Sequence, residues 1–267
     1  MAKGIKYTNQ PLGTFDGLCH YVDKNGFYIV KGKGGAKGSV MKNNPDLIRT
    51  RENYTEYGIC AKWTHLVRMN LSDIVHLCYN NYTSWINQMG KNIQKMDTED
   101  LRGHRGVKSS QHKSLLTSLN FNEQHLFKHV LTREPEVVVS EDRKTITVNM
   151  PQFVSNNELI WPRPFLYYRF TLQIGQLSDY LWDDEGVKFT PEYPNAEDNR
   201  IVIRGDWMSK STNPLDISLT ASFAETKLPA ENITVTVGLG IEIGSNEAPG
   251  TISFSKGDGT MALIACL

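Results

Sequence analysis

The second half of the chain is a series of short strand-like runs with no helical pattern between them, and this feature limits the fold most strongly. From Leu215 to Phe223, apolar and polar residues alternate strictly, as in a half-buried antiparallel strand. Runs of this kind, separated by turn residues, predict an antiparallel β-sandwich. The expected strands cover residues 136–140, 144–150, 165–174, 200–204, 215–223, 232–243, 251–255 and 260–266.

The region before residue 134 has helical periodicity instead. Asn44 can cap a helix and Pro45 suits the first helical position, which predicts a helix over about 45–69. From Leu71 to Met96, apolar residues recur at steps of mainly four and three, which predicts a second helix of about 25 residues. Two helices so close in sequence are expected to form an antiparallel hairpin, with the apolar stripe packed inside it or forming a seam between subunits. A further helical piece is expected around residues 121–131.

The amino-terminal residues 14–31 predict a β-hairpin. Two aromatic and β-branched runs flank a turn at residues 23–26, and its Asn25-Gly26 step tolerates the positive φ of a tight turn. The glycine-rich stretch 32–39 that follows is expected to be a mobile loop, or an arm that orders on a partner. These patterns together predict an α+β protein, with a hairpin and glycine-rich arm at 1–43, a helical region at 44–133 and a β-sandwich domain at 134–267.

Charge also divides the chain. Residues 1–130 contain 18 Lys/Arg and 10 Asp/Glu, a net charge of +8, whereas residues 131–267 contain 11 and 19, a net charge of −8. Such a division suits head-to-tail contacts between copies, because the basic part of one copy can meet the acidic part of the next. Pairing of these charges within one monomer is the alternative. The residues expected to make contacts are Lys31, Lys33, Lys37, Arg102, Arg105 and Lys108 on the basic side and Asp183, Asp184 and Glu185 on the acidic side.

The cysteines and the apolar runs bear on the compartment. Cys19, Cys60, Cys78 and Cys266 show neither CxxC spacing nor the density of a disulfide scaffold, so we expect reduced, mostly buried thiols. The first residues lack the apolar core of a signal peptide, and no apolar run approaches the roughly 18 residues of a membrane span. We therefore expect a cytoplasmic protein without a membrane span, and release as part of an assembly is compatible with this.

No nucleotide, cofactor or catalytic motif is complete. The stretch 32–39 resembles a P-loop, but Lys37 and Gly38 stand in the reverse of the required order. The dinucleotide pattern GxGxxG fails as well, because Lys37 occupies the place of its third glycine. No GxSxG elbow occurs. We therefore assign no cofactor and no catalytic residue.

Two sets of residues are candidates for metal binding. His125 and His129 have the i, i+4 spacing that places two imidazoles on one helix face, but Leu126 stands where a zincin motif requires Glu. They are weak metal candidates, and a structural or solvent-facing pair is the favoured reading. An acidic cluster could bind a hard cation, but its spacing does not match an EF-hand, so a solvated turn is favoured for Asp179, Asp183, Asp184 and Glu185.

The order of elements resembles a group of conserved, uncharacterised Bacteroidota proteins. In the first half the resemblance is carried by Gly13, Gly17, Tyr28, the Asn44-Pro45 step, Arg49, Arg51, Glu52, Asn53 and the helix through Trp63. In the second half it is carried by the step at residues 160–162 and the strand at residues 170–175. The resemblance implies an amino-terminal hairpin and helices followed by a β-domain, and no active-site residues.

These observations favour a structural protein that assembles with itself, as a filament, ring or particle subunit. Glycine-rich loops and a hairpin are suitable arms for adding a strand to a neighbour's sheet. The first alternative is a module that binds nucleic acid or another polyanion through the basic half. The second is a metal-dependent hydrolase built around His125 and His129.

Overall fold

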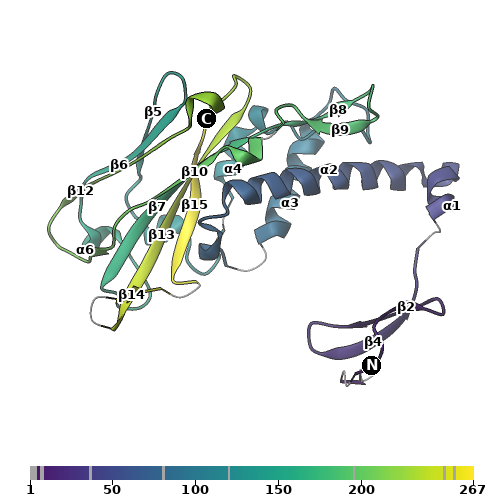
Figure 1. The fold of residues 1–267 in the computed structure, drawn as a ribbon, viewed down its shortest axis with the longest axis horizontal. Coiled ribbons are helices and arrows are strands. Elements are labelled where there is room, and N and C mark those ends of the chain that lie inside the picture. The colour runs from purple at the N-terminus through teal and green to yellow at the C-terminus, as the bar shows by residue number, and fades with distance from the viewer. Residues whose placement is uncertain are drawn as a thin grey trace. The chain divides into compact units, whose positions relative to one another are not determined.

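The computed structural model describes residues 5–6, 9–35, 38–79, 82–119, 121–194, 196–248, 251–254 and 257–267 (Figure 1). The chain forms two compact units, which we call unit 1 (Met1–Arg51) and unit 2 (Glu52–Leu267). Helices and antiparallel sheets occur together, so the expected α+β class is confirmed. The division lies after residue 51, whereas the sequence placed boundaries after residues 43 and 133.

Unit 1 contains a four-stranded antiparallel sheet. Its strands are β1 (Ile5–Lys6), β2 (Gly13–Phe15), β3 (Leu18–Val22) and β4 (Phe27–Gly32), in the order β1-β4-β3-β2. The predicted hairpin is confirmed as β3 and β4. Its turn is closed by Asp23 Oδ1, which accepts the amides of Asn25 and Phe27 at 2.9 Å, while Gly26 adopts a φ of +82°.

A second turn of this sheet was not predicted. Asp16 and Gly17 both have positive φ, 53° and 73°, and they connect β2 to β3. An Asp-Gly step is a standard signal for a two-residue hairpin turn. After β4 come the short helix α1 (Gly38–Asn43) and the 3₁₀ turn η1 (Pro45–Leu47).

The first predicted helix is confirmed as α2 (Ile48–Asn70), preceded by η1. Asn44 caps η1, since its side chain accepts the amide of Asp46 at 2.9 Å. The second helix was predicted too long, because regular helix α3 covers only Tyr82–Met96. The residues before it form turns and the 3₁₀ turn η2 (Val75–Leu77).

Helices α2 and α3 are antiparallel, as expected. Thr64 bonds Asn87 at 2.9 Å, and nearer the start of α2, Glu56 pairs with Lys91 of α3 at 2.6 Å. Between these contacts the indole of Trp63 lies against Gly90, where an added Cβ would come within 2.8 Å of the ring. Leu71, Cys78 and Ile93 of the predicted apolar stripe are buried within unit 2, whereas Met96 at its end is 47% exposed.

The central six-stranded sheet of unit 2 is built on β7 (Tyr167–Leu177) and β13 (Thr234–Ala248). Strand β7 also pairs with β10 (Arg200–Arg204) and β11 (Met208–Ser209), while β13 pairs with β14 (Thr251–Ser253) and β15 (Gly259–Cys266). Both faces of β7 and of β13 from Thr234 to Gly244 are largely buried, because another layer covers each face (Figure 1).

A three-stranded sheet covers one face of the central sheet. It consists of β12 (Leu215–Ser222), β6 (Thr145–Phe153) and β5 (Glu136–Val139), in that order. The predicted alternation of β12 is confirmed, with Ile217, Leu219 and Ala221 buried. Residues of both sheets form one hydrophobic cluster.

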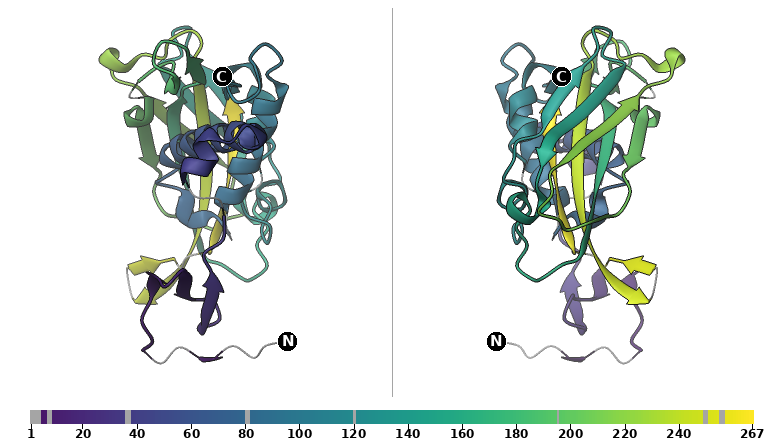
Figure 2. Two further views of the ribbon diagram at one scale, coloured as in Figure 1. Left: turned by 90° about the vertical axis from the view of Figure 1, so that its right-hand side faces the viewer. Right: turned by 90° about the vertical axis from the view of Figure 1, so that its left-hand side faces the viewer.

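The helices cover the other face, in front of the sheets in one view of Figure 2 and behind them in the other. The segment from Leu71 to Leu77 lies directly on glycines of β13. An added Cβ at Gly238 would meet Ile74 at 2.9 Å, and one at Gly240 would meet Leu77 at 2.8 Å. The helical region and the sheets therefore share a core and form one unit.

The remaining elements of unit 2 are short. The hairpin formed by β8 (Tyr180–Asp183) and β9 (Lys188–Pro191) was not predicted, nor was β11. The helical piece expected at 121–131 is only α5 (Phe127–Val130). The other short helices are α4 (Lys113–Thr117) and α6 (Ser155–Glu158), and the other 3₁₀ turns are η3 (Ser109–Gln111), η4 (Ala196–Asp198) and η5 (Glu225–Lys227).

Candidate functional site

The basic loop between α3 and α4 folds around buried carboxylates of its own unit. Glu56, on α2, accepts hydrogen bonds from both Nε and Nη2 of Arg105, at 2.8 and 2.9 Å. Lys91 Nζ and the Gly103 amide also donate to it, at 2.6 and 2.9 Å. Burial alone raises the pKa of the Glu56 carboxyl, but these hydrogen bonds outweigh burial and lower its pKa from 4.5 to about 2.

A second buried carboxylate, Asp97, organises the start of the same loop. It accepts the amides of Glu99, Asp100 and Gly106 at 3.0–3.2 Å. Lys108 Nζ lies 3.2 Å from Asp97, 3.1 Å from Glu99 and 3.3 Å from Asp100. The positive charge of Lys108 is therefore shared among carboxylates of unit 2.

The third predicted contact residue of this loop, Arg102, is more accessible. Its Nη2 donates to Asn53 Oδ1 at 2.8 Å, and its Nε lies 3.5 Å from Glu52. Arg102, Arg105 and Lys108 thus lie in one loop, and each pairs with acidic groups of the first half of the chain. This arrangement leaves the loop little free positive charge for a polyanion.

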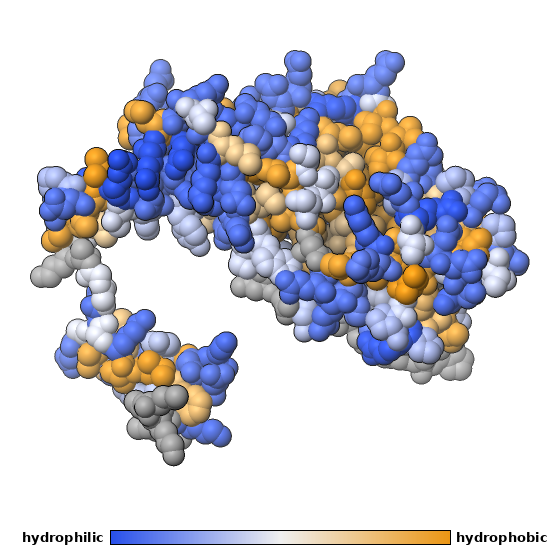
Figure 3. All heavy atoms as spheres, turned by 180° about the vertical axis from the view of Figure 1, so that it is seen from behind, coloured by the Kyte–Doolittle hydropathy of each residue, from blue (hydrophilic) through white to orange (hydrophobic). Residues whose placement is uncertain are grey.

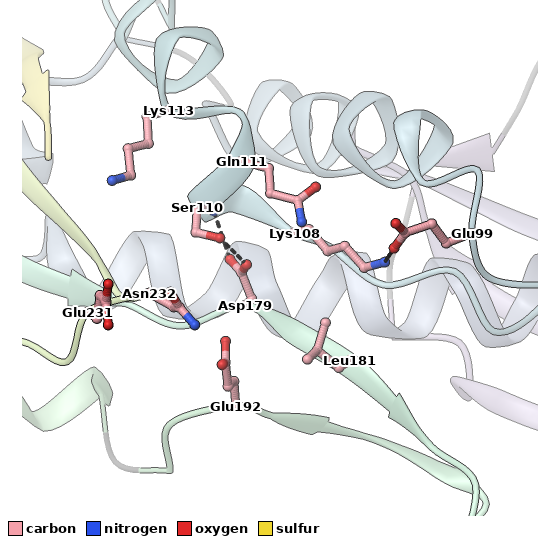
Figure 4. Close-up of a pocket in the computed structure, with 10 residues that line it drawn as sticks. All are labelled: Glu99, Lys108, Ser110, Gln111, Lys113, Asp179, Leu181, Glu192, Glu231 and Asn232. Carbon is pink, nitrogen blue, oxygen red and sulfur yellow. Dashed lines mark hydrogen bonds and ion pairs between the residues drawn. The ribbon is translucent and has the colours of Figure 1, made fainter.

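A polar pocket of about 450 Å³ opens beside this loop (Figure 4). On one side Asp179 accepts hydrogen bonds from the Ser109 hydroxyl at 2.8 Å and from the Ser110 amide and hydroxyl at 2.9 and 2.5 Å. Through these hydrogen bonds, Asp179 holds η3 in place. The pocket is lined by Glu99, Lys108, Ser110, Gln111, Lys113, Asp179, Leu181, Glu192, Glu231 and Asn232.

The mixed charges of this pocket suit a polar ligand better than a metal ion. Among the described residues, no group of three or more His, Cys, Asp or Glu side chains is placed to hold a metal. The Ser110 hydroxyl donates to the Asp179 carboxylate at 2.5 Å, and the residues that line the pocket include no histidine that could activate it as a nucleophile.

The predicted acidic contact residues lie at the tip of the β8–β9 hairpin. Asp183 Oδ1 accepts the amides of Glu185 and Gly186, both at 3.1 Å, and Asp184 Oδ1 accepts the indole N–H of Trp182 at 2.7 Å. In the described part of the chain, neither aspartate nor Glu185 forms an ion pair. Their negative charge is available to a partner.

Next to this tip, an open groove of about 450 Å³ lies between the hairpin and α2, and we call it the hairpin groove. Its apolar side chains include Tyr54, which is 80% exposed, and Val187, which is 72% exposed. The ring of His104 stacks on Trp182 with centroids 3.9 Å apart. The groove is lined by Tyr54, Thr55, Gly58, Ile59 and Lys62 of α2 and by Trp182, Val187, Lys188 and Phe189 of the hairpin.

The sheet of unit 1 has an unusually open apolar face. Cross-strand register places alternate residues on one side, where Phe15 and Leu18 are each 38% exposed and Val30 is 46% exposed. Figure 3 shows apolar atoms, in orange, on the surface of this unit. We call this side the apolar face; it consists of Phe15, Leu18, His20, Val22, Tyr28 and Val30.

The predicted basic contact residues of unit 1 are only partly described. Lys31 is exposed on β4, with its Nζ 5.2 Å from the centroid of the Tyr21 ring. Lys33 is exposed just after β4. Lys37 lies outside the described residues. Lys31 and Lys33 belong to unit 1, whereas the loop at 102–108 belongs to unit 2. The predicted basic contact residues therefore do not form a single surface within one unit.

The two histidines proposed for a metal do not share a helix. His125 precedes α5, and its amide donates to Asn122 Oδ1 at 2.9 Å, while His129 lies within α5 and is exposed. The His125 ring rests on Trp161 at 4.2 Å, and burial together with Arg163 lowers its pKa. The i, i+4 spacing therefore does not place both rings on one helical turn.

One buried charge cluster had no sequence signal. Glu242 on β13 lies 3.0 Å from His76 and also pairs with Arg169, whose guanidinium lies 4.6 Å from the Trp207 ring centroid. Burial raises the pKa of Glu242, but hydrogen bonds from His76 and Arg169 lower it overall. These residues are distant in sequence, so only the fold brings them together, and their contacts join the 71–77 segment to the sheet.

Comparison of the chain with models of protein families, with curated proteins and with solved structures finds no match. The resemblance to the Bacteroidota group therefore stays a prediction. No helix in the described residues is both long and apolar enough to cross a membrane. The four cysteines are free thiols, as expected, and Cys60 and Cys78 are buried.

Proposed function

We propose that this chain is a structural building block that assembles with copies of itself, unit 1 of one copy docking on unit 2 of the next. The observation that carries the proposal is the lack of a core in unit 1. Among the side chains of unit 1 that the structure describes, none is buried. Phe15, Leu18 and Val30 remain open on one side of its sheet.

A small sheet without buried side chains is expected to be stable only when another layer covers its apolar face. Isolated small sheets are marginally stable in water, and an antiparallel sheet normally packs one face on a core. No disulfide in the described chain supplies an alternative source of stability. A partner that buries the apolar face would stabilise unit 1 and gain affinity from the same contact.

Charge favours a second copy as that partner. Unit 1 contains 9 Lys/Arg and 3 Asp/Glu, a net charge of +6, and unit 2 contains the other 20 and 26, a net charge of −6. Contacts between unlike units are heterologous, and they generate rings when the rotation closes and open filaments when it does not. Opposite net charges also accelerate association.

The test is sedimentation velocity and negative-stain microscopy of the full chain in about 0.05 M and about 0.5 M NaCl, which strongly changes the screening of surface charges. We expect species larger than the 30.2 kDa monomer, and fewer of them at high salt. A strict monomer in both solutions at the highest attainable concentration would refute the proposal.

Polyanion binding is the second candidate, and the net charge of +6 on unit 1 favours it. Lys31 and Lys33 are exposed, and Lys31 lies 5.2 Å from the Tyr21 ring centroid; such basic and aromatic groups suit a nucleic-acid strand. Against it, Arg105 and Lys108 are neutralised by carboxylates. Fluorescence anisotropy with labelled single-stranded DNA tests it, and affinity that is absent or independent of salt would remove it.

A further inference from the structure

We propose that the hairpin groove of unit 2 is the surface on which unit 1 of a second copy docks. This inference rests on the proposed self-assembly and adds its receptor site. The groove and the apolar face of unit 1 each expose large apolar side chains to water, so each would be stabilised by an apolar partner surface. Burial of both in one contact removes two unfavourable surfaces together.

The groove has the chemistry of an interface centre. Its lining includes the aromatic rings of Tyr54, Trp182 and Phe189, of which Tyr54 is 80% exposed and Phe189 is 8% exposed. Aromatic residues are enriched in the centres of protein interfaces, where they carry much of the binding energy. Its open form and volume of about 450 Å³ accept a few protruding side chains, of the size that Phe15 and Leu18 present.

The backbone at Val187 supports a role for this side chain. Val187 has a φ of +48°, a conformation that is strained for a β-branched residue and suits Gly or Asn. It is nevertheless an exposed valine that lines the groove. The backbone conformation at this position favours Gly or Asn, yet the residue is an apolar valine. Residues in such strained conformations are frequent at binding sites.

Charge complementarity selects unit 1 as the occupant. Asp183, Asp184 and Glu185 surround the tip of the hairpin, while unit 1 carries a net charge of +6. Lys62 and Lys188 also line the groove, so the negative charge lies at the tip and not on the groove floor. Apolar contact in the groove and ionic contact at its rim match the usual anatomy of an interface.

The principal variant is Val187→Asn in the full chain. Asn tolerates the positive φ of this position, so the melting temperature should stay the same or rise, while the apolar contact is lost. We expect the dissociation constant for self-association to rise about tenfold or more. The matched control is Leu166→Asn, an exposed apolar residue of unit 2 outside the groove, which should change it by less than about twofold.

A charge variant gives an independent readout. Glu185→Lys places a positive charge at the rim, where unit 1 would bring its own positive charge. We expect weaker association at about 0.05 M NaCl and a much smaller difference at about 0.5 M, because salt screens exposed charges. An equal effect in both solutions would contradict ionic contact at the rim.

Mixing two defective proteins tests the polarity of the contact. The double variant Leu18→Thr with Val30→Thr removes apolar area from unit 1 and keeps β-branched residues in its strands. At a concentration at which the unaltered chain assembles, this protein and Val187→Asn should each remain mostly monomeric when alone. Together they should form 1:1 dimers of twice the 30.2 kDa chain mass and no larger species, since one intact face meets one intact groove.

The outcomes separate the groove from self-assembly in general. If the unaltered chain assembles and Val187→Asn and Glu185→Lys assemble equally well, the groove is refuted and self-assembly stands. If the unaltered chain is a strict monomer, both proposals fail. If the two defective proteins do not form dimers when mixed, the docking of unit 1 in the groove is refuted.

Discussion

Replacing Glu56 by Gln removes the central charge of the network that folds the basic loop. The Glu56 side chain is 0% exposed and pairs with Arg105 and Lys91. Removal of one partner from a buried ion pair costs about 3–5 kcal/mol, because the opposite charge is left without compensation. Arg105 and Lys91 are 20% and 30% exposed and can partly rehydrate, so we expect a value near the lower end, about 3 kcal/mol.

The assay is urea unfolding at pH 7, supported by thermal melting. For a chain of this size, about 3 kcal/mol corresponds to a fall in melting temperature of roughly 6–12 °C. The control is Glu99→Gln, which also removes a partner of a lysine, but Glu99 is 81% exposed. Its effect should stay below about 0.5 kcal/mol. A loss below about 1 kcal/mol for Glu56→Gln would contradict the reasoning.

The same variant predicts a pH dependence with a defined sign. The Glu56 pKa is lower in the folded chain, about 2, than its ordinary value of 4.5. Its stabilisation is therefore complete above pH 4.5 and is lost as the pH falls through about 2. The difference in unfolding free energy between the unaltered protein and Glu56→Gln should shrink across this interval. A constant difference would refute the assigned charge state.

Three further predictions concern unit 2. Gly240→Ala should lower stability by about 1–3 kcal/mol in urea unfolding, because the new Cβ would lie 2.8 Å from Leu77. Asp179→Asn should cost about 1–3 kcal/mol and accelerate amide exchange at Ser110, whose hydrogen bond to the carboxylate is weakened; unchanged exchange would argue against that bond. Burial raises the pKa of Cys78 to about 12, so a thiol reagent at pH 8 should label it only after unfolding, as mass spectrometry can check.

Local patterns predicted the elements whose environment is simple. The strict alternation of 215–223 defined β12, which buries one side and exposes the other. Asn44-Pro45 marked the start of the first helix because a cap acts within a few residues. The Asp16-Gly17 turn of unit 1 has an equally local sequence signal, although it was not predicted.

The second helix was predicted too long because periodicity does not distinguish one helix from two consecutive segments that share a core. Leu71 and Ile74 are buried and lie against Gly238 and Gly240 of β13. The glycines that admit this close approach lie more than 150 residues later in the sequence. No local signal links the two regions.

The sequence by itself determined the α+β class, most of the strands, the first helix and the presence of opposite charges on one chain. Tertiary structure decided where those charges act. In the folded chain, Arg105 and Lys108 pair with buried carboxylates, whereas Asp183, Asp184 and Glu185 are left beside the hairpin groove. The basic residues of the amino-terminal region belong to unit 1, in which no described side chain is buried. The physical reason is that strand and helix patterns depend on neighbouring residues, whereas charge pairing and exposure depend on residues that only folding brings together.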